Sequence, residues 1–354
     1  MNKKEIITRI LIVTIVILVA LGICTILYKN KNIHLLGEAT QNDSTVINIY
    51  AMDTYMKISI PSKGPQVDSA LAECKDRIEE LDCALSTENP QSEVYQLNAN
   101  SGGQLSPDTY ALITASFQAS EISDGAFDIT VYPLMKLWGF NTDTPKVPSD
   151  DEILDCLSKV GMNNIEIINP STITMFPGTQ IDFGGIAKGY ASFEIAQILR
   201  AHEIDSAILN LGGNVYALGT KIDGSPWKVA IRTPKDANEV LCTIEASDEE
   251  VVTSGGYQRF FEENGKIYHH IIDPKSGYPA DSGLTSVSIV TKDAVLGDAL
   301  STAIFVLGKD QGIDIWRKNS DLFDIVMLTS NNELYATSGL KGRISSLYNI
   351  SYVN

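Results

Sequence analysis

The sequence predicts an α+β fold, and three observations indicate it. Of the 354 residues, 44% are hydrophobic, enough for the core of one large domain or two ordinary ones. Apolar residues recur with a helical period in some segments and alternate with a strand period in others. The two kinds of segment are mixed along the chain without regular βαβ alternation, which favours α+β over doubly wound α/β proteins.

The N-terminal segment 1–31 predicts a signal-anchor. Three basic residues precede residues 10–27, an uncharged apolar run that is long enough to span a bilayer and longer than a usual cleaved signal. An uncleaved transmembrane helix is therefore favoured over a cleaved signal or a lipoprotein. We expect a single-pass cell-membrane protein with an extracytoplasmic domain, in which the polar segment 32–45 is a linker and residues 46–350 form the folded domain.

The charge balance argues against a nucleic-acid partner. The net charge is −17, and residues 1–31 hold five of the 27 basic residues and one of the 44 acidic residues. The rest of the chain therefore has a net charge of −21, whereas nucleic-acid binding requires a basic face. The five cysteines include no C-x-x-C pair, and Cys74 and Cys83 lie on opposite faces of one predicted helix. They predict buried thiols rather than a zinc site or disulfide framework.

The first third of the domain begins with a strand pair. Residues 46–60 alternate as two strands, and residues 66–85 form an amphipathic helix. Residues 86–103 are rich in turn-forming residues and predict a loop. Ser106 followed by Pro107 is typical of a helix start, and this helix should end before Gly125.

An apolar and aromatic run follows at residues 125–140. Most of it predicts core, but Trp138, Gly139 and Phe140 at its end have the aromatic surface that binds flat rings. A helix is then predicted over 150–160. Two short strands are predicted next, over 165–168 and 172–176.

The segment 179–191 predicts a strand that ends at Asp182, a turn at Gly184 and Gly185, and a helix over 187–202. Glycines without a Cβ allow close approach of a ligand, and the helix amino end beside Lys188 suits a phosphate group. The spacing matches neither the dinucleotide fingerprint nor the P-loop. An ordinary turn with a solvated lysine remains the alternative.

The last part of the chain alternates between strands and one helix. Residues 207–219 predict a strand, a bulge at Gly212 and Gly213, and a second strand. The segments 227–232, 240–246 and 287–290 also predict strands. They are followed by a helix over 297–307.

Two short motifs carry candidate chemistry. Asp298 and Thr302 stand four positions apart, so a helix presents both oxygens on one face, as a hard cation such as Mg²⁺ requires. Helix capping is the alternative for this pair, because both residue types favour helix starts. His270 and Asp273 lie three apart in a turn-rich segment, where a structural role for the histidine is the alternative.

Taken together, these motifs resemble the ApbE family of FAD:protein FMN transferases over about residues 46–310. The matching pieces occur in the family's order: MDT at Met52, SEVYQLN at Ser92, GAFD to WGF between Gly125 and Phe140, DFGGIAKGYA at Asp182, SGGY at Ser254, HIIDP at His270 and DALSTAIFVLG at Asp298.

The resemblance implies a mixed α/β, T-fold-like single catalytic domain, with FAD in a deep crevice and Mg²⁺ at its pyrophosphate. The FAD contacts of the family correspond to Met52, Trp138, Gly139, Phe140, Asp182, Lys188 and Ile272. The metal ligands of the family correspond to the carbonyl of Gly185 and the side chains of Asp298 and Thr302. The family usually has glycine where Asp53 stands.

The implied activity is transfer of FMN from FAD to a serine or threonine hydroxyl of another protein, with release of AMP. Mg²⁺, held by Asp298, and Lys188 would offset the charge that develops on the phosphates, and His270 is the candidate for deprotonating the acceptor hydroxyl. Two alternatives share the site: an FAD pyrophosphatase that uses water as the acceptor, and a carrier that binds FAD without chemistry.

The acceptor is expected to be a separate protein. The family modifies segments of the D-x-x-[ST]-G-A-[ST] type, and neither 281–283 nor 298–302 contains the full pattern. The chain should therefore not modify itself. Its partner is expected to be an exported or membrane-bound flavoprotein.

Overall fold

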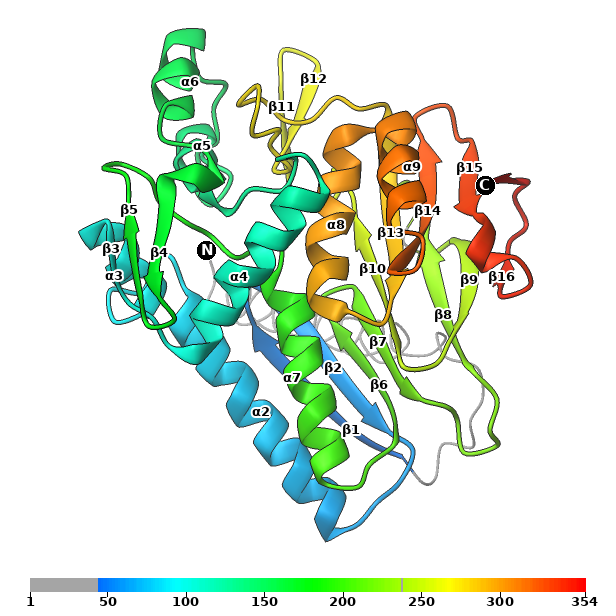
Figure 1. Ribbon diagram of the computed structural model, residues 1–354. Coiled ribbons are helices and arrows are strands. Elements are labelled where there is room, and N and C mark those ends of the chain that lie inside the picture. Colours follow the sequence, from blue (N-terminus) through cyan, green and yellow to red (C-terminus); the bar gives the residue numbers. More distant parts are fainter. Residues whose placement is uncertain (1–43, 237) are drawn as a thin grey trace, which may run out of the picture. The chain divides into compact units, whose positions relative to one another are not determined.

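The computed structural model describes residues 44–236 and 238–354 (Figure 1). The signal-anchor predicted at 1–31 and nearly all of the linker predicted at 32–45 lie outside the described residues. In the described part of the chain, no helix is long and apolar enough to cross a membrane.

A nine-stranded sheet is the centre of the domain, with strand order β1-β2-β6-β7-β10-β13-β14-β15-β17. All neighbouring strands run antiparallel except the last pair, which is parallel. The strands are β1 (Thr45–Ala51), β2 (Thr54–Ile60), β6 (Ser206–Leu211), β7 (Asn214–Gly219), β10 (Glu249–Ser254), β13 (Leu284–Thr291), β14 (Phe323–Thr329), β15 (Leu334–Thr337) and β17 (Ile350–Val353).

Helices pack on one face of this sheet and enclose the main core between them (Figure 1). They are α2 (Pro65–Leu85), α4 (Pro107–Ile122), α7 (Ala187–Ala201), α8 (Ala294–Leu307) and α9 (Lys309–Lys318). Fully buried side chains such as Ile78, Leu112 and Ile195 fill this layer. Burial of this apolar area is the main stabilising contribution to the fold.

A small sheet of β16 (Ile344–Ser345), β9 (Val240–Ala246) and β8 (Trp227–Arg232) has a separate apolar cluster. Val229 and Ile244 from this sheet are buried with Val251, Val290 and other residues of the central strands. The central strands therefore contribute to a core on each of their faces.

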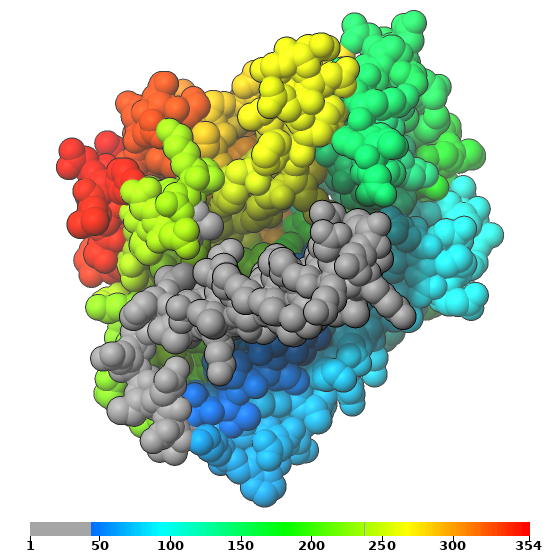
Figure 2. Space-filling view, turned by 180° about the vertical axis from the view of Figure 1, so that it is seen from behind, coloured from blue at the N-terminus to red at the C-terminus, as the bar shows by residue number. Residues whose placement is uncertain are grey.

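The remaining elements lie beside the sheet. A three-stranded sheet contains β3 (Gly102–Gln104), β5 (Thr172–Met175) and β4 (Ile165–Asn169), and α3 (Glu93–Asn100) precedes it. The hairpin of β11 (Phe260–Glu263) and β12 (Lys266–His269) lies next to α5 (Tyr132–Trp138) and α6 (Asp150–Leu157), as Figures 1 and 2 both show. Short 3₁₀ turns occur at Ile129–Val131, Met162–Asn164 and Ser338–Leu340.

Most predicted elements are confirmed. The strand pair at 46–60 and the helix at 66–85 are found as β1, β2 and α2. The side chain of Ser106 accepts the Thr109 amide and caps α4, as its position before a proline indicates. Helix α7 ends one residue before the predicted end.

Four local predictions are wrong. Residues 86–103 are not all loop, because Ser92 accepts the Tyr95 amide and starts α3. Residues 181 and 182 belong to no strand. Gly212 and Gly213 form a two-residue hairpin turn with positive φ rather than a bulge, since Leu211 pairs directly with Asn214. Helix α8 begins at Ala294, three residues earlier than predicted.

Candidate active site

The approach to α7 is held by side chains rather than by a sheet. The Ile181 amide donates to Asn98 Oδ1 at 2.7 Å, and the Ile181 carbonyl accepts from Asn98 Nδ2 at 2.9 Å. The Asp182 amide donates to the Ile129 carbonyl at 2.9 Å. Asp182 is thereby fixed immediately before the two glycines.

The carboxylate of Asp182 stabilises the turn that follows it. Its Oδ1 accepts the Gly184 amide at 2.8 Å. Burial raises the pKa of the Asp182 carboxyl above its ordinary value, while the Gly184 amide and the charges of Arg259 and Lys188 act in the opposite direction. The two cations therefore act on the same carboxyl group.

Gly185 is required for close packing rather than for an unusual φ angle. A Cβ added there would lie 3.0 Å from Phe127 Cε2 and 3.8 Å from Thr302 Oγ1. The turn is thus pressed against the first residues of the aromatic run on one side and against α8 on the other. The Gly185 backbone and the Thr302 hydroxyl, two of the predicted metal ligands, lie next to each other.

The amino end of α7 is not an open phosphate cradle. The amides of Ile186 and Ala187 both donate to the Phe183 carbonyl, and the Gly189 amide donates to Asp298. The amino end of this helix was predicted to suit a phosphate group, but these three amides are already bonded within the protein and do not support that prediction. Lys188 remains as the cationic group beside the turn, with its Nζ 3.3 Å from the Gly184 carbonyl oxygen.

Asp298 is the buried acidic group at the junction of α7 and α8. Its side chain is nearly inaccessible, its Oδ2 accepts the Gly189 amide at 3.0 Å, and its Oδ1 lies 3.7 Å from Lys188 Nζ. Capping does not explain this position, because the cap of α8 is Asp293, whose side chain accepts the Leu296 amide. Asp298 lies in the second turn, so Thr302 shares its helix face.

A cluster of hydroxyl groups surrounds Thr302. Ser254 Oγ lies 2.7 Å from Ser301 Oγ and 3.3 Å from Thr302 Oγ1, and Ser301 Oγ donates to the Asp298 carbonyl at 2.8 Å. Ser254 ends strand β10, which brings this strand to the site. Ser254 belongs to the SGGY motif, for which no role in the site was predicted.

This donor set fits a hard cation. Gly185, Asp298 and Thr302 offer a carbonyl, a carboxylate and a hydroxyl oxygen, the ligand types that Mg²⁺ prefers. No group of three or more His, Cys, Asp or Glu side chains among the described residues could hold a metal ion. A cation at this position would therefore need further oxygens from its ligand.

His270 is oriented by the backbone of Arg259. Its amide and its ring Nδ1 each lie 3.1 Å from the Arg259 carbonyl oxygen. A carbonyl can only accept, so Nδ1 carries the proton and Nε2 has the free lone pair. Burial lowers the pKa of His270 to about 4, and the nearby charges of Arg259, His269 and Lys188 act in the same direction.

The neighbouring His269 has a structural environment. Its Nε2 lies 3.0 Å from the Ala280 carbonyl, and its ring packs edge-on against Phe305 with the centroids 5.4 Å apart. Burial lowers the pKa of His269 too. Of the two adjacent histidines, only His270 lies at the Arg259 carbonyl.

The predicted aromatic binding residues lie in a third apolar cluster. Trp138 is fully buried, and its indole N–H donates to the Gly277 carbonyl at 2.9 Å. Gly139 ends α5 with φ 74°, and Phe140 stacks on Trp138 at 6.0 Å. Ile272 is buried in the same cluster. In this structure, Trp138 packs against protein groups on the side of the hairpin β11–β12.

Met52 lies on the turn between β1 and β2. Met52 and Asp53 have φ of 49° and 56°, so the turn has two successive left-handed residues, a conformation that glycine, asparagine and aspartate tolerate best. The Met52 amide donates to Asp82 Oδ1 at 2.8 Å. Asp53 Oδ2 lies 3.5 Å from Arg259 Nη2, which links this turn to the residue that precedes β11 and whose carbonyl contacts His270.

The predicted site residues thus form two groups. In the first group, Lys188 pairs with Asp298, Gly184 connects Lys188 to Asp182, and Gly185 lies beside Thr302. The backbone and charge of Arg259 relate His270 to this group, and the second group is the apolar cluster of Trp138. Sequence reasoning missed the roles of Gly189, Ser254 and Arg259. Two of them carried a signal in the sequence: Ser254 lies in the SGGY motif, and Gly189 is a glycine inside a predicted helix, which indicates close packing. In the structure, a Cβ at Gly189 would overlap the Ala294 carbonyl of α8.

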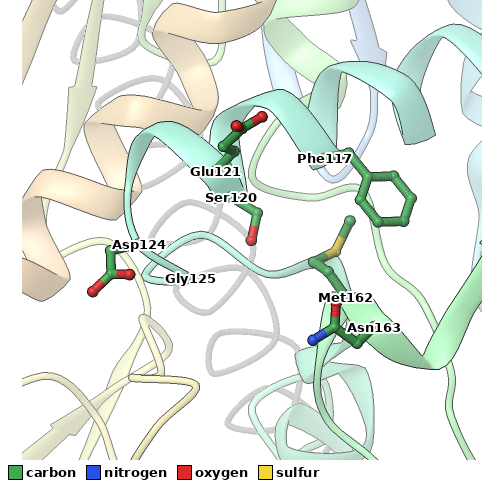
Figure 3. Close-up of a pocket in the computed structure, with 7 residues that line it drawn as sticks. All are labelled: Phe117, Ser120, Glu121, Asp124, Gly125, Met162 and Asn163. Carbon is green, nitrogen blue, oxygen red and sulfur yellow. The ribbon is translucent and has the colours of Figure 1, made fainter.

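A separate pocket of about 400 Å³ lies at the end of α4 (Figure 3). In the close-up, the Met162 side chain points toward Phe117, whereas the carboxylates of Glu121 and Asp124 point outward. None of the predicted site residues lines this pocket. It is therefore not part of the candidate active site.

Comparison with known proteins gives a consistent family assignment. The model of the ApbE family matches residues 52–327. An FAD:protein FMN transferase of Klebsiella pneumoniae is 33% identical over 74% of this chain and 83% of its own length. The transferase of the same name from Treponema pallidum is also 33% identical, over 83% of this chain and 87% of its own.

Solved structures agree in fold. An ApbE protein of Thermotoga maritima superposes with a TM-score of 0.78 and 31% identity, over 85% of this chain and 99% of its own. The flavin transferase ApbE of Vibrio cholerae superposes with a TM-score of 0.76 and 26% identity, over 84% of this chain and 98% of its own. The mixed α+β architecture is thereby confirmed. The chain is a flavin transferase and belongs to the ApbE family.

Proposed function

We propose that this chain moves FMN from FAD onto a serine or threonine hydroxyl of an acceptor protein, with Mg²⁺ as its cofactor. The observation that carries this proposal is the position of Asp298, between the Gly189 amide and the Lys188 ammonium group. A carboxylate fixed in this way beside a hydroxyl and a glycine backbone suits a cation at a pyrophosphate.

In this proposal, Gly185, Asp298 and Thr302 hold the metal. A bound Mg²⁺ would neutralise charge on the phosphate oxygens and orient the pyrophosphate for displacement. Asp298 is also held in place by a protein donor, so its remaining oxygen can be directed at the cation without a change of rotamer. Lys188 adds a second positive charge on the same side.

The residues of the chain support an in-line displacement. The acceptor hydroxyl oxygen forms a bond to the FMN phosphorus, and the bond from that phosphorus to the oxygen shared with AMP breaks. The hydroxyl proton passes to His270 Nε2, which is free because Nδ1 donates to Arg259. AMP leaves with the bridging oxygen, and Lys188 offsets the charge that develops there.

The binding of FAD would involve the residues named from the family resemblance. Met52 and Asp182 lie on backbone segments that are fixed by hydrogen bonds. Trp138, Gly139, Phe140 and Ile272 would contribute through the apolar cluster rather than through an exposed ring, since Trp138 is buried. Direct stacking of a flavin on Trp138 does not fit this arrangement, because Phe261 and Tyr268 of the hairpin β11–β12 already pack on the indole.

We further propose that the chain is membrane-anchored by residues 10–27 and that its domain is extracytoplasmic. The support is the uncharged apolar run preceded by basic residues. The proposed acceptor is an exported or membrane-bound flavoprotein with a D-x-x-[ST]-G-A-[ST] segment. Anchoring raises the effective concentration of the enzyme near such a partner.

An AMP-release assay tests the proposal. The chain is incubated with FAD and Mg²⁺, with and without a protein that carries the acceptor segment, and AMP is measured by chromatography. Acceptor-dependent AMP supports transfer. AMP that forms equally well without acceptor identifies a pyrophosphatase, and bound FAD without any AMP identifies a carrier; either result contradicts the proposal.

A further inference from the structure

The turn between β1 and β2 holds a carboxylate in a fixed position. Asp53 occupies the second of two successive left-handed positions, and Ala51 pairs with Thr54 directly across the turn. Non-glycine residues adopt this conformation at some cost in energy, so its presence at a candidate site suggests a function. The Met52 amide is tied to Asp82, which limits movement of the turn.

The partner of this carboxylate is Arg259. The ion pair joins Arg259 Nη2 to Asp53 Oδ2 at 3.5 Å, with side-chain exposures of 45% and 78%. Among the described residues, Asp53 is the sole carboxylate in an ion pair with this arginine. A single exposed contact at this distance is weak, and an anion with better geometry can replace it.

The backbone of Arg259 contacts the candidate active site through His270, and its charge acts on the site. Its carbonyl is the acceptor for both the amide and the ring Nδ1 of His270. The charges of Arg259 and Lys188 act on the pKa values of the same two groups, Asp182 and His270. Two cations therefore converge on this part of the site, as binding of a doubly charged pyrophosphate requires.

We propose that Arg259 is a second binding cation for the FAD pyrophosphate beside Lys188, and that Asp53 occupies Arg259 until the pyrophosphate displaces it. This inference rests on the proposed function. Guanidinium groups bind phosphate oxygens in a bidentate manner, whereas the Asp53 contact uses one nitrogen. Asp53 thus acts as an internal competitor that weakens FAD binding.

The test is a double-mutant cycle on the full-length chain. Asp53→Asn removes the charge and keeps a residue that tolerates the left-handed turn. Arg259→Gln removes the cation. When a competitor occupies a site, the apparent Kd is the intrinsic Kd divided by the fraction of free sites, so Asp53→Asn should tighten FAD binding about three- to tenfold. Arg259→Gln should weaken binding about tenfold.

Asp248→Asn is the matched control. Asp248 also has a left-handed backbone, with φ 52°, and pairs with an arginine, Arg200, at 2.7 Å. It precedes the first residue of β10, whereas Ser254 of the candidate site is the last residue of that strand. Riboflavin, which lacks phosphates, is the ligand control. Asp53→Asn should not tighten the binding of riboflavin, and Asp248→Asn should not tighten the binding of FAD. All affinities are measured by fluorescence titration in magnesium buffer without acceptor.

The inference is supported if Asp53→Asn tightens FAD binding but not riboflavin binding, and if the gain disappears in the Arg259→Gln background. It is overturned if Asp53→Asn leaves the FAD affinity unchanged or weaker, or if the gain persists without Arg259. A wild-type chain that binds no FAD would overturn the proposed function itself, so the two failures can be told apart.

Discussion

The Asp298 carboxylate accepts the Gly189 amide across the junction of α8 and α7, at 3.0 Å. The two helices approach closely here, because a Cβ at Gly189 would overlap the Ala294 carbonyl. This one hydrogen bond therefore connects α7 to α8 and also fixes the orientation of the Asp298 carboxylate. Any change at Asp298 must be judged by its effects on both stability and activity.

Asp298→Asn should separate these two roles. The asparagine oxygen can still accept the Gly189 amide, so the melting temperature should change little, while FMN transfer should fall by about 100-fold or more because a charged metal ligand is lost. Asp293→Asn, at the cap of the same helix, is the control and should leave the transfer rate close to wild type. Full activity of Asp298→Asn in magnesium buffer would contradict the metal assignment.

Lys188→Met should weaken FAD binding or turnover by about 10- to 100-fold, the range expected for loss of one charge-assisted contact to phosphate. Lys188→Met should weaken the binding of FAD more than the binding of riboflavin, which has no phosphate. Lys75→Met removes a lysine from an exposed pair with Glu79 on α2 and should have no such effect. Unchanged FAD kinetics in Lys188→Met would remove this lysine from the site.

The pH dependence of transfer should reflect the lowered pKa of His270. Since this pKa is about 4, the ring is neutral and able to accept a proton at any pH well above that value. The rate of transfer should therefore hold between pH 8 and pH 6 and fall only as the pH approaches about 4. His270→Gln should be slow at every pH, whereas His202→Gln, in a surface pair with Glu73, should keep the wild-type profile. A midpoint near 6.5 would contradict the assigned environment of His270.

Glu250 is a buried acid that the proposed reaction does not use. Neither of its carboxyl oxygens makes a hydrogen bond of normal geometry in the described part of the chain, and the nearby Ser192 hydroxyl is the polar group that most favours its charged form. Burial raises its pKa well above the ordinary value of 4.5, and the charge of Asp298 acts in the same direction. A raised carboxyl pKa stabilises the folded chain below the unfolded pKa, and this contribution is lost as pH rises through the folded value.

Glu250→Gln should therefore raise the melting temperature at pH 8 by roughly 2 to 5 °C and give little gain at pH 4, in metal-free buffer. Its neighbour Glu249 pairs with Arg343 at 2.9 Å, so Glu249→Gln should not stabilise at either pH. Thermal unfolding followed by circular dichroism measures both variants. An equal rise in the melting temperature of Glu250→Gln at pH 4 and pH 8 would show that the buried charge of Glu250 does not cause the stabilisation.

The sequence predicted the elements whose signal is local. The alternation of residues 46–60, the apolar stripe of α2 and the Ser106 cap each determine their own structure. The helix α3 was missed because its flanking residues favour turns, and only the Ser92 cap marked its start. The early start of α8, with Asp293 as its cap, excludes helix capping as the role of Asp298, and ligation of a metal stays a prediction.

The tertiary parts of the site could not be read from residue types. The contact of His270 with Arg259 uses a main-chain carbonyl, so no side-chain pattern encodes it. The burial of Trp138 depends on the hairpin at Phe261 and Tyr268, which is more than one hundred residues away in the chain. The motif residues were identified from family resemblance, and their mutual contacts come from the fold.

The central claim is that this chain forms a covalent bond between FMN and an acceptor hydroxyl. Mass spectrometry of an acceptor protein, incubated with the chain, FAD and Mg²⁺, tests it most directly. We predict an acceptor that gains the mass of FMN less one water at its serine or threonine, with no such adduct on the enzyme and far less adduct in the same time with Asp298→Asn. An unmodified acceptor in the presence of released AMP, or an FMN adduct on the enzyme itself, would contradict the account.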